Sequence, residues 1–220
     1  MQVYNTIVSF FQNGGPFMYP IVLILALGLA IAIERWWYLS RTEARNRKAW
    51  QRLEPLLARG DYEGARSTTE ENETEIGNIL NYGLSRLRST RRREDVEMAM
   101  EESLMETMPV LEKRTHYLAT FANIATLLGL LGTIIGLIQA FTAVANVDPA
   151  EKADLLSASI SVAMNTTAFG LMVAIPLLLI HALLSTKTTS LIDSLEMASV
   201  KFLNTVSPDS GRRTDEGGAA

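Results

Sequence analysis

Apolar residues gather in three long stretches of the chain, Phe17 to Tyr38, Leu118 to Val147 and Leu155 to Leu184. Each stretch is long enough to cross a hydrocarbon core of about 30 Å as a helix, which needs about 20 residues. The second and third stretches contain no Asp, Glu, Lys or Arg, although small and hydroxyl residues are frequent in them. The pattern predicts an all-α membrane protein with three transmembrane helices.

Outside these stretches, apolar residues recur every three or four positions, which is typical of amphipathic helices. Trp50 to Leu57, Ile76 to Leu87 and Val96 to Leu111 show this spacing. The last of these segments runs into the second apolar stretch with Pro109 as its interruption, so we expect one long helix with a kink near Pro109. Leu191 to Phe202 extends the third stretch in the same way. The transmembrane helices should therefore have long helical extensions.

The distribution of charge predicts the orientation in the membrane. Of the 20 Lys and Arg residues, 14 lie between Leu39 and His116. The positive-inside rule places this loop in the cytoplasm. The connection from Asp148 to Asp154 has three acids and Lys152, and the segment before Phe17 has no charge. We therefore expect a multi-pass membrane protein with its N-terminus outside and its C-terminus in the cytoplasm.

These patterns divide the chain into eight consecutive segments, three of which are the transmembrane helices. In chain order, we expect an outer-face interfacial helix (1–16), transmembrane helix 1 (17–38), a cytoplasmic helical domain (39–116), transmembrane helix 2 (117–147), a periplasmic turn (148–154), transmembrane helix 3 (155–185), a cytoplasmic helix (186–206) and a disordered tail (207–220).

Composition argues against several classes of function. The chain has no cysteine, which excludes disulfides, thiolate metal sites and thiol nucleophiles. His116 and His181 are far apart in sequence and form no ligand motif, so we expect neither a metal nor a cofactor. The net charge of −4 implies no basic surface for nucleic acid. An enzyme is not expected, because no nucleophile, metal set or pair of catalytic acids occurs in one place.

Three glycines in the second stretch have a helical spacing. Gly129, Gly132 and Gly136 line one stripe of a helix and allow another backbone to approach closely. A phosphate-binding loop is excluded, because the segment has no lysine and no preceding strand and lies at bilayer depth. Together with the small residues of the third stretch, the stripe predicts close packing of helices. These small residues are Ala163, Ala168 and Gly170.

Polar but uncharged residues are the candidates for lining a pore. Thr133 in the second stretch and Thr167 in the third both lie near the bilayer middle at a rise of 1.5 Å per residue. Ser161 and Asn165 form a stripe on the third stretch, and Thr166 flanks it. A hydroxyl at this depth either bonds within the protein or faces a polar lumen, so both pore lining and helix packing stay open.

Charged residues at the end of the first stretch are candidates of another kind. Glu34 and Arg35 are expected to be interfacial anchors rather than proton carriers. His181, near the inner end of the third stretch, could belong to a proton relay or be a packed neutral side chain.

Two motifs resemble signature stretches of the MotA/TolQ/ExbB proton channel family. They are Leu127-Leu-Gly-Leu-Leu-Gly-Thr133-Ile-Ile-Gly136 and Thr167-Ala-Phe-Gly170-Leu-Met-Val-Ala-Ile-Pro176. The similarity extends over nearly the whole chain, and with three predicted spans the chain is most similar to ExbB and TolQ, since MotA-type stators have four.

The resemblance implies a homopentamer in the bacterial inner membrane, with a periplasmic N-terminus and a cytoplasmic C-terminus. Its second and third transmembrane helices would surround a central pore, and the glycine stripe and the small residues of the third stretch would pack neighbouring subunits. It also implies an ExbD/TolR-like single-span partner whose aspartate carries the proton, with Thr133 and Thr167 lining the pore beside it. Two positions depart from the family pattern. Thr126 stands where the family commonly has proline, and Val162 stands where ExbB-type proteins often have glutamate. A proton path through that glutamate is therefore not available in this chain.

The expected function is that of a proton-driven motor subunit that acts on a TonB-like protein for outer-membrane transport. The first alternative is a TolQ-like motor for envelope maintenance, working on a TolA-like protein. An alternative of another class is a structural scaffold or a partner-independent ion pore, which would assemble or conduct without an ExbD-like chain.

Overall fold

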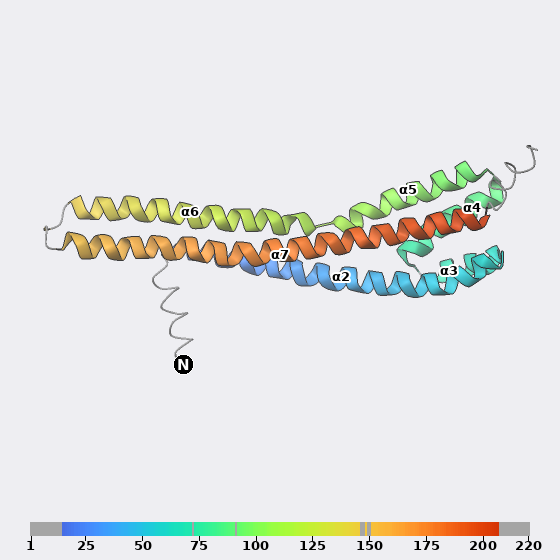
Figure 1. Cartoon of the computed structure of the whole chain (residues 1–220), viewed down its shortest axis with the longest axis horizontal. Helices are drawn as coiled ribbons and strands as arrows, with labels where there is room; N and C mark the ends of the chain where they lie inside the picture. Colours follow the sequence, from blue (N-terminus) through green and yellow to red (C-terminus); the bar gives the residue numbers. More distant parts are fainter. Residues whose placement is uncertain (1–14, 72, 91, 146–147, 149–150, 207–220) are drawn as a thin grey trace, which may run out of the picture. The chain divides into compact units, whose positions relative to one another are not determined.

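The computed structural model describes residues 15–71, 73–90, 92–145, 148 and 151–206. Most of the expected outer-face helix (1–16) and the whole expected tail (207–220) lie outside the described residues. The helices are α2 (Met18–Ala58), α3 (Tyr62–Glu71), α4 (Glu75–Ser89), α5 (Arg93–Glu112), α6 (Thr115–Ala145) and α7 (Lys152–Val206) (Figure 1). The described residues are all-helical and contain no strand.

The described chain has three helical segments that are long and apolar enough to cross a membrane. They are α2, the run from α5 through α6, and α7. The predicted all-α class with three membrane-spanning helices is thereby confirmed. Both α2 and α7 continue well beyond the predicted ends of their spans. The polar residues that follow each span within these helices include no glycine, and the first glycine after the first span is Gly60, just past the end of α2.

The chain forms two compact units, which share α2 and α7. The membrane unit comprises residues 1–35 and 114–184, and the polar unit comprises residues 36–113 and 185–220. The apolar halves of α2 and α7 and the whole of α6 thus belong to the membrane unit. The other halves of α2 and α7 join α3, α4 and α5 in the polar unit.

In the membrane unit, α6 and α7 pack as an antiparallel pair. A Cβ atom added at Gly136 would lie 2.8 Å from Ala163 Cβ, and one added at Gly170 would lie 2.7 Å from the carbonyl oxygen of Ala125. The residue numbers of the contacts therefore rise along α7 as they fall along α6. Helix α2 packs on α7 in the same unit, where a Cβ at Gly28 would lie 2.7 Å from Leu177 Cδ2.

In the polar unit, α2 and α7 run parallel. The Nζ atom of Lys187 donates to the Ser40 hydroxyl at 2.8 Å, and Lys201 Nζ lies 3.6 Å from Glu54 Oε1. Both pairs are 147 residues apart in sequence, so the two helices keep one register over 14 residues. Buried side chains of both helices are part of the apolar core of this unit, among them Leu39 and Leu53 on α2 and Leu191 and Leu195 on α7.

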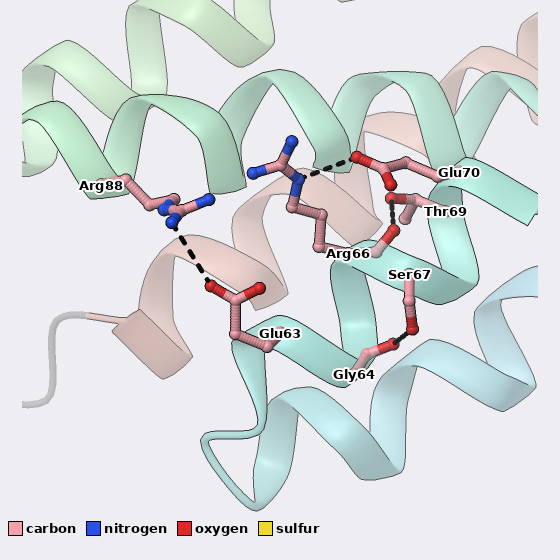
Figure 2. Close-up of polar contacts among 7 residues, drawn as sticks. All are labelled: Glu63, Gly64, Arg66, Ser67, Thr69, Glu70 and Arg88. Atoms are coloured by element: carbon pink, nitrogen blue, oxygen red, sulfur yellow. Dashed lines mark hydrogen bonds and ion pairs between the residues drawn. The ribbon is translucent and has the colours of Figure 1, made fainter.

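Helices α3 and α4 form a short polar hairpin in the same unit. Thr74 caps α4 by accepting a hydrogen bond from the Gly77 N–H at 3.1 Å. Figure 2 shows the polar contacts of the hairpin, among them Arg66 to Glu70 at 2.8 Å within α3 and Arg88 to Glu63 at 3.8 Å. These ion pairs are largely exposed, so each contributes at most about 1 kcal/mol.

The interruption of the long helix lies after Pro109, where a kink was expected, and falls between Glu112 and Thr115. Pro109 lies inside α5, which continues to Glu112, and α6 begins at Thr115. Arg114 in the break has a φ of 66°, a left-handed conformation that ends α-helical hydrogen bonding. Its Nη1 atom lies 3.6 Å from Glu34 Oε2. The break therefore depends on the backbone of Arg114 rather than on the missing N–H of the proline.

Candidate pore-lining helices

The glycine stripe of α6 is covered by α7 of the same chain. A Cβ atom at Gly129 would lie 3.2 Å from the Cα of Thr167, and one at Gly132 would lie 2.5 Å from Thr166 Cγ2. Only a hydrogen in place of a side chain permits this approach. Gly129, Gly132 and Gly136 thus lie at a close contact between α6 and α7, and a role in lining a pore stays a prediction.

This packing removes one argument for a pentamer. The glycine stripe, Ala163 and Gly170 were expected to pack neighbouring subunits, but the structure uses them between α6 and α7. The reason is that α6 and α7 are consecutive helices, and small residues on both let their backbones approach closely. Ala168 is exposed. The homopentamer stays a prediction that rests on family resemblance.

Thr167 forms a hydrogen bond between the two helices. Its hydroxyl donates to the carbonyl oxygen of Gly129 at 2.8 Å, and its side chain is part-buried. Because Gly129 has no side chain, the hydroxyl can reach a backbone carbonyl on the other helix. Thr167 therefore ties α7 to α6 at the level of the first glycine.

Thr133 and Thr166 bond back to their own helices. The Thr133 hydroxyl donates to the Leu130 carbonyl at 2.6 Å, and the Thr166 hydroxyl donates to the Val162 carbonyl at 3.1 Å. Thr166 is buried against Gly132, whereas Thr133 is half-buried. Self-bonding satisfies a hydroxyl in an apolar region while leaving its oxygen lone pairs available to a further donor.

Thr133 and Thr167 lie on the same side of the helix pair. Gly132 contacts Thr166, and Thr133 and Thr167 are the next residues on each helix. Each step along an α-helix rotates by about 100°, and in an antiparallel pair both rotations lead to the same flank. The two hydroxyls thus share a flank of α6 and α7, with Thr133 about one turn further along α6 than the level of Thr167.

Ser161 and Asn165 belong to another face of α7. Asn165 lies about 160° around the helix from Thr167, since two residues correspond to about 200° of rotation. Ser161 is exposed and Asn165 is half-buried. One lumen along the Thr133 and Thr167 flank would therefore not be lined by this polar stripe.

The charges at the end of the first span have different surroundings. Glu34 is exposed and pairs with Arg114. Arg35 is only 3% exposed, so it is a buried part of the packing rather than a side chain that extends into solvent. His181 is half-buried. In the described part of the chain, no group of three or more His, Asp or Glu could hold a metal ion.

A repeated cluster of Lys, Trp and Glu on α2 and α7 was not foreseen from the sequence. Lys187 Nζ lies 3.2 Å from Glu43 Oε2 and 4.9 Å from the centre of the Trp36 ring. Lys201 Nζ lies 5.5 Å from the Trp50 ring. The sequence does contain a sign of this cluster, because Trp36 and Trp50 on α2 are 14 residues apart, as are Lys187 and Lys201 on α7. Two heptads of equal spacing on two helices indicate a shared register.

Comparison with known proteins adds a further finding. Residues 71–197 match the sequence model of the MotA/TolQ/ExbB proton channel family. A protein named biopolymer transport protein ExbB homolog, from Methanothermobacter thermautotrophicus, is 29% identical over an alignment of 206 residues. The alignment covers 88% of this chain and 68% of that protein. Biopolymer transport protein ExbB-like 1 of Synechocystis is 32% identical over 177 residues, or 79% of this chain and 68% of that protein. The Tol-Pal system protein TolQ of Haemophilus influenzae is 31% identical over 93 residues, or 42% of this chain and 40% of that protein.

Proposed function

Because this membrane protein belongs to the MotA/TolQ/ExbB proton channel family, we propose that it works with an ExbD-like partner to drive a TonB-like protein in outer-membrane transport. As a member of this family, the chain is a proton channel motor subunit. The observation that supports the proposed partner and role is the family match over α6 and the membrane part of α7. Both signature motifs, with Thr133 and Thr167, lie in these helices. The names of several relatives refer to ExbB, which supports this branch of the family.

The chemistry of α6 and of the apolar part of α7 supports the need for a partner. From Leu118 to Val147 and from Leu155 to Leu184 the sequence has no carboxylate that could take up a proton. A partner helix with an aspartate would supply it, and Thr133 and Thr167 on their shared flank would line the pore and offer hydroxyls to it. We place both residues in the proton path on this ground.

The energies involved are of matching size. One proton that moves through 100 mV releases about 2.3 kcal/mol. Neutralising a carboxylate in the membrane removes a cost of at least about 2.5 kcal/mol. Protonation of the partner's aspartate would thus be enough to free its helix to move against α6 and α7.

A second candidate is a TolQ-like motor that acts on a TolA-like protein in envelope maintenance. The match to the H. influenzae TolQ protein supports it. The two candidates use the same proton chemistry and differ in what the motor drives. Deletion of the gene separates them, because loss of energy-dependent uptake supports the first and leakage of the envelope supports the second.

The test of the proposal is purification of the native complex, followed by reconstitution in vesicles with a pH gradient. We expect a companion chain with one transmembrane helix and an aspartate in it, and proton flux when both chains are present. A complex without any such companion, or equal flux from this chain alone, would favour the scaffold or the partner-independent pore instead.

A further inference from the structure

The part of α2 in the polar unit carries a row of positive charges on one face. The residues recur at helical spacing on the side away from buried Leu39, Asn46 and Leu53, and all of them are exposed. We call this row the basic stripe; it consists of Arg41, Arg45, Lys48 and Arg52 on α2 and Arg59 directly after its end. Such a row on one helix favours a partner with the opposite charge.

The outer face of α5 has the opposite character. Its acidic stripe, Glu94, Glu97 and Glu101, is exposed, and two methionines on this part of α5, Met98 and Met105, are exposed as well. Met98 is 69% exposed and Met105 is 61% exposed. Exposed methionines between acids indicate a helix face suited to contact with another protein surface.

The two stripes are not paired with each other or with other described side chains of opposite charge. The ion pairs of the polar unit involve other residues, such as Lys187 with Glu43 and Lys201 with Glu54. In the basic stripe, Arg45 donates to a backbone carbonyl, that of Glu73. The charges of both stripes are therefore available to a second molecule.

The two stripes lie at the same level of the polar unit. Arg93 at the start of α5 donates to Asn204 Oδ1 at 3.1 Å, and α7 pairs with α2 at an offset of 147 residues. Arg93 is thus level with residue 57 of α2. Because α5 runs in the opposite direction, Glu97 is level with Arg52 and Glu101 with Lys48, to within about one residue or 1.5 Å.

In Figure 1 the polar parts of α2 and α5 are drawn on either side of α7. A surface on one side that complements a surface on the other side favours head-to-tail association of identical copies. A rotation axis parallel to the helices relates two copies without shifting one along the other, so two stripes at the same height on the helices can meet. We propose that the basic stripe of α2 docks onto the acidic stripe of α5 in a second copy of this chain, with Arg52 facing Glu97 and Lys48 facing Glu101.

Anionic lipid headgroups are a less suitable occupant of the basic stripe. From Arg41 to Arg59 the stripe extends for about 27 Å at 1.5 Å per residue. Headgroup charge is screened within about 8 Å at physiological salt, so a membrane surface would reach one end of the stripe at most. The acidic stripe from Glu94 to Glu101 spans about 10 Å and lies level with the middle of the basic stripe, which a membrane surface at one end would not reach.

Charge reversal tests the docking in the full-length protein. The acidic variant carries Glu97→Arg and Glu101→Arg, and the basic variant carries Lys48→Glu and Arg52→Glu. We expect each variant alone to lower the oligomer fraction at least tenfold in native mass spectrometry from mild detergent at low salt. The variant with all four changes should recover most of the wild-type fraction, because the opposite charges face each other again.

The matched control reverses two exposed acids of α7 in the same unit, with Asp193→Arg and Glu196→Arg. It makes the same change in net charge as the acidic variant and should leave the oligomer fraction unchanged. A wild-type fraction in both single-stripe variants, no recovery in the fourfold variant, or loss of bound anionic lipid from the basic variant with an unchanged oligomer fraction in the same mass spectra would overturn the docking. Self-association is measured without proton flux, so its failure and a failure of the proposed channel function are separate results.

Discussion

Thr167 and Thr133 differ in what their hydroxyls hold together. The Thr167 hydroxyl joins α7 to α6 through Gly129, whereas the Thr133 hydroxyl bonds within α6. Removing the first should therefore affect both helix packing and any role in the pore. Removing the second should affect a role in the pore alone.

We expect Thr133→Val to leave assembly normal and to reduce proton-coupled uptake strongly, because valine keeps the shape but not the hydroxyl. Thr167→Val should also lose an interhelical bond worth about 0.6 kcal/mol, and Thr167→Ser should restore both properties. Thr166→Val is the control, because Thr166 is buried against Gly132. Uptake is measured beside complex yield for all variants, and normal uptake in Thr133→Val would remove Thr133 from the proton path.

Glycine contacts decide how closely the membrane helices approach, and they differ in what a methyl group would meet. At Gly170 the nearest atom is the backbone oxygen of Ala125 at 2.7 Å. At Gly28 it is the terminal methyl group of Leu177 at the same distance. A backbone atom moves only with its helix, while the end of a leucine side chain can change rotamer.

We therefore expect Gly170→Ala to destabilise the protein by about 1 to 3 kcal/mol, as overpacking does. Gly28→Ala should be close to neutral, because a gain of about 1 kcal/mol in helix propensity offsets the small rearrangement. Thermal unfolding in detergent, followed by circular dichroism, compares the two variants. Equal melting temperatures would mean that α6 and α7 are not as close as the structure places them.

For the molecule as a whole, the orientation in the membrane is a prediction from the distribution of charge, and it has a direct test. The chain contains no cysteine, so single-cysteine variants need no other change. We expect Ser89→Cys, at the end of α4, to react with a membrane-impermeant maleimide only from the cytoplasmic side. Ala150→Cys, between the second and third spans, should react only from outside. The reverse pattern of labelling would contradict the predicted topology.

The amino-acid sequence was sufficient to determine the helical class, the three membrane-spanning segments and the family, because long apolar runs and two compact motifs are local signals. Tertiary structure decided how the glycines are used, since packing between α6 and α7 depends on which faces meet. It also decided that Thr167 bonds to Gly129, that the helical run is interrupted at Arg114, and that α2 and α7 share one register. The glycine contacts, the Thr167 bond and the shared register depend on contacts between residues far apart in the chain, which no single local pattern contains. The break depends on the left-handed backbone of Arg114, which the sequence pattern did not indicate.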